Sequence, residues 1–210
     1  MTGTLQKLLA AGDHEWEHWG RSTWNVTTGA KDIGHTDDET TFAQYVIDVY
    51  NRVGGGNPTV DQIANDLYFW SAVGMSAIFA AAGFSKAEFP FAQAHAKWLV
   101  AFIKARRDNS AALYHGFRLH EPQASPEVGD MVAYTRGNMT FNAAQKFYDK
   151  TGSYFSHSDL VVARRTSEID VIGFNVRDSV TKKTIALDVN GLIGDRTHNW
   201  FTVLRRRGFE

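Results

Sequence analysis

The sequence contains no cysteine. This absence excludes disulfide bonds, thiolate metal sites and a cysteine nucleophile. It does not fix the compartment, because a chain without thiols folds equally well under reducing and oxidising conditions. Proline is scarce too, with 4 residues among 210, and no proline run or low-complexity stretch marks a domain boundary. We therefore expect one compact unit.

The chain also lacks an excess of charge and any long apolar run. It has 22 basic and 23 acidic residues, without the positive surplus that drives binding to nucleic acid. The longest apolar stretch, Trp98–Ile103, is far too short to span a membrane. The N-terminus has no apolar h-region, so we expect synthesis in the cytoplasm without a signal peptide. Action in the periplasm or on a host cell wall would need another delivery route.

Aromatic residues are plentiful: 14 Phe, 7 Tyr and 6 Trp can fill a large core. In the first half, apolar residues recur at helical spacing after Thr36 or Asp37, either of which can cap a helix, and Gly54–Gly56 ends that helix. Further helices are predicted over 71–82 and 91–104. Ser85 and Glu88 have the spacing of a capping box.

The second half changes to short runs that are β-branched or alternating. Strands are predicted over 130–134, 159–163, 169–173, 184–188 and 200–204. Helices followed by strands indicate an α+β fold, with N-terminal helices packed on a C-terminal antiparallel sheet.

Three segments, in order, carry the candidate chemistry. Residues 68–83 read Tyr-Phe-Trp-Ser-Ala-Val-Gly and end in Ala-Gly, twelve residues after Ser71. Residues 125–132 contain Pro-Glu-Val-Gly-Asp-Met-Val, and residues 156–162 contain Ser-His-Ser-Asp-Leu-Val-Val. Together they resemble papain-like bacterial cell-wall amidases and peptidases, in which a cysteine opens a helix and a histidine begins a strand.

The resemblance covers about residues 40–205 and implies a papain-like fold. Residues 36–210 would form the hydrolase-type domain and residues 1–35 a helical extension. Ser71 stands at the cysteine position and His157 at the histidine position. In the related CHAP group a Glu-x-Asn follows; here Asn175 matches, but Gly173 stands at the glutamate position. The sequence is closest to an uncharacterised domain-of-unknown-function family with Trp-Ser-Ala, Gly-Asp and His-x-Asp elements.

Physical chemistry supports the same residues. A hydroxyl at a helix N-terminus lies at the positive end of the helix dipole, where free backbone N–H groups can bind an oxyanion. His157 can accept a proton from Ser71, and Asn175 or Asp159 can orient the imidazole. Each residue also has a structural interpretation: Ser71 as a helix cap, His157 and Asp159 as hydrogen-bonded strand residues, and Asn175 as a turn residue.

Two further residues are candidates for substrate binding. His95 occupies a place where the suspected family has a histidine, and the third predicted helix turns it toward the cleft or away from it. Trp70 directly precedes Ser71, and either lines the groove or packs in the core.

A competing pattern lies near the N-terminus. His14-Glu15-Trp16-Glu17-His18 matches the His-Glu-x-x-His of zinc peptidases. A zinc site needs a third ligand, and none is identifiable, so an amphipathic helix with Trp16 and Trp19 facing inward is the alternative.

Three hypotheses follow. The first is a peptidoglycan hydrolase, a phage component or antibacterial effector, that cleaves an amide of the stem peptide with Ser71 and His157 and needs no metal or cofactor. A delivery or immunity protein would then be a partner. The second is an inactive relative that binds cell wall or protein, suggested by the missing thiol and glutamate. The third is the zinc peptidase.

Overall fold

The computed structural model describes residues 3–208 as an α+β fold. The helices are α1 (Gly3–His18), α2 (Thr40–Val53), α3 (Val60–Ala64), α4 (Ser71–Ala81), α5 (Ala96–Arg107) and α6 (Phe141–Gln145), with 3₁₀ turns η1 (Pro122–Ala124) and η2 (Lys146–Asp149). The strands are β1 (Ser22–Asn25), β2 (Lys31–Asp32), β3 (Tyr114–Arg118), β4 (Met131–Thr135), β5 (Ser156–Arg164), β6 (Glu168–Val176), β7 (Ser179–Ala186) and β8 (Trp200–Arg206).

All eight strands form one mixed sheet in the order β2-β1-β7-β6-β5-β4-β8-β3. Every neighbouring pair is antiparallel except β1 and β7, which run parallel with Ser22 opposite Thr181. The sequence predicted an antiparallel sheet, and the parallel β1–β7 pair corrects that prediction. The parallel strand comes from the first 35 residues, which supply β1 and β2 as well as α1. These two strands are too short to show a periodic pattern in the sequence.

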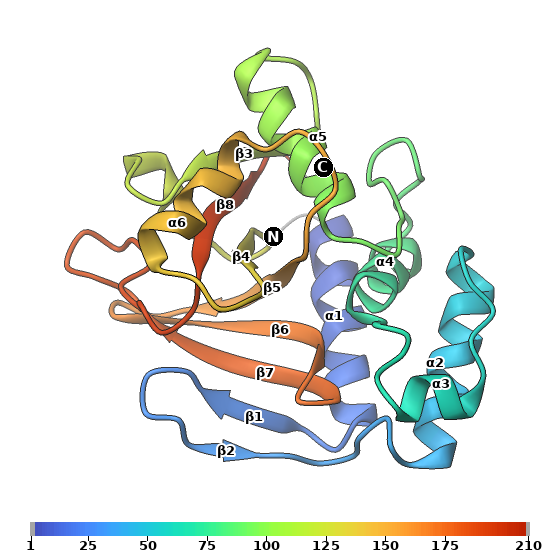
Figure 1. Ribbon diagram of the computed structural model, residues 1–210. Helices are drawn as coiled ribbons and strands as arrows, with labels where there is room; N and C mark the ends of the chain where they lie inside the picture. Colours follow the sequence, from blue (N-terminus) through green and yellow to red (C-terminus); the bar gives the residue numbers. More distant parts are fainter. Residues whose placement is uncertain (1–2, 209–210) are drawn as a thin grey trace.

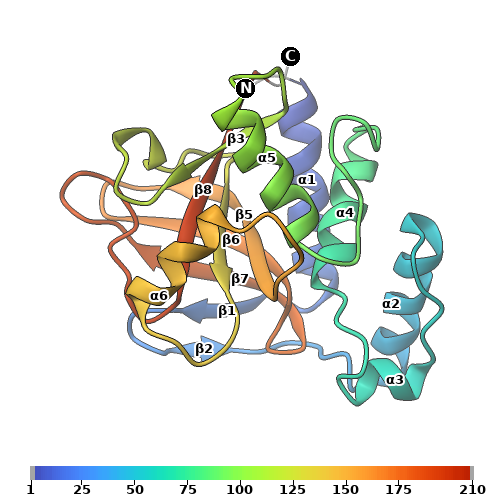
Figure 2. The ribbon, with the colours of Figure 1, turned by 45° about the horizontal axis from the view of Figure 1, so that its top comes forward.

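Helices cover one face of the sheet. In both views α1, α2 and α4 lie together beside the strands (Figure 1; Figure 2). The core on this face joins residues of α1, α2, α4 and α5 to Leu160, Ile172 and Phe174 of the sheet. A second buried cluster, including Val161, Val171 and Trp200, lies on the other face. Alternate residues of β5 and β6 therefore enter different cores.

The predicted helices are present with shifted boundaries. The helix predicted over 71–82 is α4, but α5 begins at Ala96 rather than at residue 91. The N-cap position of α2 is Glu39 rather than Thr36 or Asp37, and its side chain makes no capping hydrogen bond. Ser85 Oγ and Glu88 Oε2 do bond at 2.6 Å, although they close a turn instead of opening a helix. Of the helices in residues 3–208, none has the length and apolar content of a membrane span.

Helix α4 approaches β6 closely because Gly74 has no side chain. A Cβ atom on Gly74 would lie 2.4 Å from Cδ1 of Phe174, whose ring is buried. By contrast, a Cβ atom on Gly12 of α1 would lie 3.7 Å from Ile172 and Leu160, which is ordinary van der Waals contact. The two glycines are therefore a matched pair on neighbouring helices.

Gly74→Ala is expected to destabilise the fold by about 1–3 kcal/mol, because the new methyl group overpacks the α4–β6 contact. Gly12→Ala is expected to stabilise it by about 0.5–1 kcal/mol, because alanine restricts the unfolded chain and fits the space. Urea denaturation of both variants measures the changes. Equal effects of the two substitutions would contradict the proposed packing.

Candidate active site

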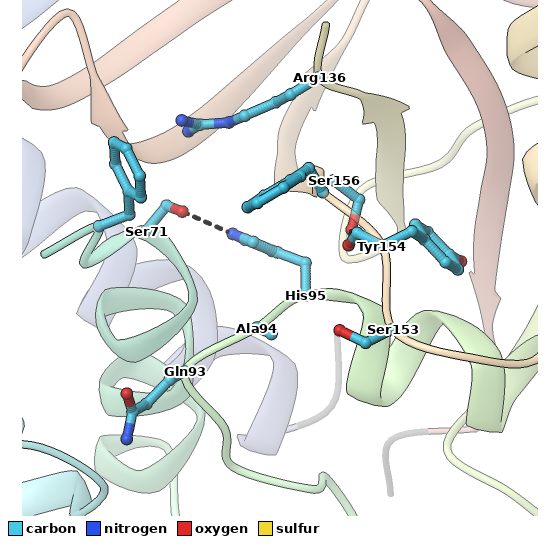
Figure 3. A pocket seen from close by; sticks show the side chains of 10 residues that line it. Ser71, Gln93, Ala94, His95, Arg136, Ser153, Tyr154 and Ser156 are labelled. Carbon is cyan, nitrogen blue, oxygen red and sulfur yellow. Dashed lines mark hydrogen bonds between the residues drawn. The ribbon is translucent and has the colours of Figure 1, made fainter.

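Ser71 is the first residue of α4 and its side chain lies at a cavity. The residue is 5% exposed and adjoins a cavity of about 550 Å³ (Figure 3). The cavity is lined by Phe69, Ser71, Gln93, Ala94, His95, Arg136, Ser153, Tyr154, Phe155 and Ser156. The first intrahelical bond of α4 runs from Gly74 N to Trp70 O. The backbone N–H groups before Gly74 therefore have no acceptor within the helix and can bind an anion.

His95 is the direct partner of Ser71. Its Nε2 lies 2.9 Å from Ser71 Oγ, the contact drawn in Figure 3, and its Nδ1 lies 2.8 Å from Ser158 Oγ. The backbone N–H of Ser158 also donates to Nδ1 at 3.2 Å, and the ring is 3% exposed. The sequence placed His95 among the substrate-binding candidates, and the structure places it against Ser71.

These hydrogen bonds assign the tautomer of His95. A backbone N–H can only donate, so Nδ1 of His95 must be an acceptor and the ring proton resides on Nε2. Trp98 Nε1 donates to Ser158 Oγ at 3.1 Å, which leaves the Ser158 hydroxyl proton for Nδ1. Burial, with the nearby His157 and Arg136, holds the pKa of His95 well below its usual range. His95 is therefore neutral and donates from Nε2 to Ser71.

His95 can reach Ser158 because β5 and β6 separate at this end of the sheet. The β5–β6 ladder has its last pair at Leu160 and Ile172 on this side, and the register of β6 shifts between Gly173 and Val176. Strand β5 continues to Ser156 beside β4 alone. The Ser158 N–H is therefore available for a side chain, and the imidazole of His95 fills that role.

His157 is fully buried and belongs to a second network. Its Nε2 lies 3.0 Å from Asp159 Oδ1, and its Nδ1 lies 3.1 Å from an NH2 group of Arg136. Because arginine can only donate, Nδ1 of His157 is the acceptor and Nε2–H bonds to Asp159. The rings of His95 and His157 have centroids 4.8 Å apart. His157 thus keeps its lone pair on the nitrogen that faces Arg136.

Buried charges set the protonation of this network. Lys183 Nζ lies 2.7 Å from Asp159 Oδ2, and both side chains are fully buried. Burial alone would raise the pKa of Asp159, but Lys183 and His157 hold that pKa well below its usual range. Burial would lower the pKa of Lys183, and Asp159 raises it instead. Burial lowers the pKa of His157 to about 4, against the attraction of Asp159. The imidazole is therefore neutral at physiological pH.

Asn175 and Trp70 meet at a different carboxylate. Trp70 Nε1 and Asn175 Nδ2 both donate to Asp37 Oδ2, at 2.5 and 3.0 Å. The hydrogen bond from the Asn175 side chain thus goes to Asp37, and the residue bonded to His157 is Asp159. Trp70 is buried and stacks on Trp19 with centroids 4.7 Å apart, so it packs in the core beside the cavity wall.

The absence of a side chain at Gly173, the position that the resemblance to the CHAP group aligns with a glutamate, has a physical explanation. A Cβ atom on Gly173 would lie 2.0 Å from Asp159 Oδ1. A side chain at residue 173 and the observed carboxylate of Asp159 exclude each other. Asp159 thus occupies the space beside the imidazole that a residue on β6 would otherwise fill.

The zinc pattern on α1 gains no third ligand. Glu15 accepts a hydrogen bond from Tyr45 at 2.7 Å, and the His18 ring packs on Phe42 and Tyr45. Within residues 3–208, no three His, Cys, Asp or Glu side chains gather as a metal site would require.

Sequence reasoning missed several residues of the site. Arg136 follows β4 and had no motif, Lys183 is a buried lysine in a polar stretch of β7, and Asp37 was considered only as a helix cap. Ser158 lies inside the quoted motif, between His157 and Asp159. The strand alternation could have placed it on the opposite face from those two residues, toward the helices.

Asp37→Asn is expected to change how stability depends on pH. Burial raises the pKa of Asp37 to about 7, so between pH 4 and 7 the folded protein keeps a proton that the unfolded chain releases. Stability from this group is therefore lost as pH rises through that window. The asparagine keeps an acceptor for Trp70 and Asn175, and should gain roughly 2–4 kcal/mol relative to wild type between pH 4 and 8. Urea denaturation at both pH values measures this, and parallel curves for the two proteins would contradict it.

Comparison with known proteins gives one family. The family described as "Uncharacterized protein conserved in bacteria (DUF2272)" matches residues 21–207. No curated protein and no solved structure gives a significant match. The expectation of a domain-of-unknown-function family is confirmed, while the papain-like and CHAP likeness stays a prediction. Because the match covers most of the chain, this protein belongs to the DUF2272 family.

Proposed function

We propose that the protein is a hydrolase that cleaves an amide bond with Ser71 as nucleophile. The observation that carries this proposal is the position of the Ser71 hydroxyl: it begins α4, bonds to His95 at 2.9 Å and adjoins a cavity of about 550 Å³. A hydroxyl at a helix N-terminus beside an open cavity, with the N–H of His95 and the free N–H groups of α4 as oxyanion donors, supports acyl transfer.

In this proposal the general base is His157 and not His95. To act as base, His95 would need its lone pair on Nε2 and its ring proton on Nδ1. The Nδ1–H and the Ser158 N–H would then be two donors facing each other without an acceptor. His157 has its lone pair on Nδ1, and Asp159 orients the ring through Nε2. His157 is fully buried and its ring centroid lies 4.8 Å from that of His95, outside the lining of the cavity. Arg136 must therefore leave Nδ1, and the imidazole must turn toward the cavity, before it can accept the Ser71 proton.

The reaction then balances as two acyl transfers. Ser71 Oγ bonds to the carbonyl carbon while its proton passes to His157, and the free N–H groups of α4 and Nε2–H of His95 stabilise the new charges. Protonated His157 gives the proton to the departing amine. In the second step water attacks the ester carbon and gives a proton to His157. His157 returns the proton to Ser71 Oγ as the ester bond breaks and the carboxylic acid leaves.

The substrate class comes from the resemblance to cell-wall amidases and not from the geometry. We propose an amide of the peptidoglycan stem peptide, and a role as a phage component or delivered antibacterial effector. A delivery or immunity protein would be its partner.

A second candidate is a binding module without catalysis. It is favoured by the His95 N–H that faces Ser71, and by Arg136, which occupies the lone pair of His157. Serine in place of cysteine points the same way, because its hydroxyl is inert without a free base.

Digestion of purified peptidoglycan separates the two candidates. The wild type should release peptide fragments that mass spectrometry identifies, and Ser71→Ala and His157→Gln should each reduce the rate at least about 10³-fold, because nucleophile and base act as one unit.

Ser153→Ala is the control, since Ser153 lines the same cavity and belongs to neither imidazole network. It should keep the rate of digestion within a few-fold of wild type. If the wild type does not digest peptidoglycan, the hydrolase proposal fails and the binding module replaces it.

The pH profile of kcat/KM tests which histidine environment is used. A base must be neutral to act, and burial lowers the pKa of His157 to about 4. Activity should therefore persist at pH 5.5, where an ordinary histidine is mostly protonated, and should fall only near pH 4. Asp37→Asn removes a nearby carboxyl whose pKa is raised to about 7, and should leave this acid limb in place. An acid limb near pH 6.5 in both proteins would rule out the buried imidazole as base.

A further inference from the structure

Arg136 gives the cavity its single fixed charge. Among the residues that line it, the walls are mainly aromatic or carry hydroxyls, with Phe69, Tyr154 and Phe155 the largest apolar contributors. His95 is neutral, for the reasons given above. In Figure 3 the Arg136 side chain extends across the cavity above the Ser71–His95 pair. An anionic group that enters the cavity therefore meets one cation, close to the nucleophile.

In the part of the chain that the structure describes, the Arg136 guanidinium forms no ion pair with a carboxylate. Its NH2 donates to neutral His157, and its Cζ lies 5.7 Å from the centre of the Phe69 ring. Among residues 3–208, no carboxylate lies within ion-pair distance of Arg136, whereas Arg118 and Arg165 do have such partners. Guanidinium groups form their strongest hydrogen bonds with two oxygens of a carboxylate. The present partners of Arg136 leave that capacity unused.

We propose that Arg136 binds a carboxylate of the substrate, and that this contact draws the guanidinium away from Nδ1 of His157 and frees the base. The inference rests on the proposed hydrolase function and names its substrate class: amides that carry a carboxylate near the bond to be cleaved. Two neutral or apolar partners are exchanged for a charged one, so the movement is favoured only when the anionic substrate is present. With a substrate that lacks the carboxylate, Arg136 stays hydrogen-bonded to Nδ1 of His157.

The test measures binding without turnover, so that it is independent of hydrolysis. The protein is Ser71→Ala, and the probes are hippurate, an aromatic amide with a carboxylate, and hippuramide, its neutral carboxamide. Calorimetry should show hippurate binding about tenfold or more tightly, because a charge-assisted bond replaces a neutral one. In Ser71→Ala with Arg136→Gln, this preference should fall below about twofold.

Two further variants separate charge, fork geometry and location. Arg136→Lys keeps the charge without the fork and should retain only part of the preference. Arg177→Gln is the matched control, because Arg177 lies over Trp24 and lines a neighbouring cavity that Arg136 also borders, but it does not line the cavity of Ser71. It should keep the full preference for hippurate.

Nitrogen NMR of the histidine side chains gives a second readout. Hippurate should shift the Nδ1 resonance of His157 as its Arg136 bond is lost, and hippuramide should not. Equal binding of the two probes, failure of both to bind, or a preference that survives Arg136→Gln would overturn the inference. If the wild type hydrolyses nothing while Ser71→Ala shows the Arg136-dependent preference, the hydrolase proposal fails and the carboxylate site stands.

Discussion

The site depends on one hydrogen bond that leaves the sheet. The backbone N–H of Ser158 does not join the β5–β6 ladder but donates to Nδ1 of His95. That bond fixes the ring orientation and its tautomer together, and so determines which nitrogen faces Ser71. Because Ser71 begins α4 and Ser158 belongs to β5, the imidazole also connects the helix to the strand. A helix shift that broke this contact would leave buried donors and acceptors without partners.

The buried ion pair of Asp159 and Lys183 imposes the second constraint. Transfer of two charges into a core is expensive, and their attraction offsets this expense only with good geometry and further hydrogen bonds. Here His157 supplies one such bond at 3.0 Å, and the ring of Tyr134 lies 4.7 Å from Lys183 Nζ. The pair is therefore better understood as a device that orients His157 than as a source of stability. The Asp159 carboxylate faces the imidazole of His157, while the Lys183 ammonium group faces aromatic rings.

The sequence predicted the elements more fully than their contacts. Periodicity identified α4 and the strands around His157, because a helix with an Ala-Gly end and a β-branched run are local patterns. It missed β1 and β2, which are too short for a pattern, and Lys183, whose burial depends on a partner 24 positions earlier in the chain.

The sequence predicted which residues belong to the candidate site, but not which of them contact each other. Ser71 and His95 line one cavity, and His157 and Asp159 are fully buried next to His95. The partner of Ser71 is His95 rather than His157. A motif gives the order of residues along the chain, whereas this pairing depends on where β6 departs from β5. Arg136 belongs to no motif, since its importance arises from contacts in the folded chain: it lines the cavity and covers the lone pair of His157.

The electrostatics of the site also explain why a serine fits here. A thiolate nucleophile is usually stabilised by a protonated imidazole, and both imidazoles near Ser71 have their pKa lowered by burial. A cysteine at this position would lose much of that stabilisation and remain a thiol. A serine hydroxyl needs no charge in the resting state, and it can pass its proton to a neutral imidazole when the base is uncovered. The chain without cysteine and the site without a charged histidine are thus consistent with each other, and in the proposed reaction both make the movement of Arg136 the decisive step.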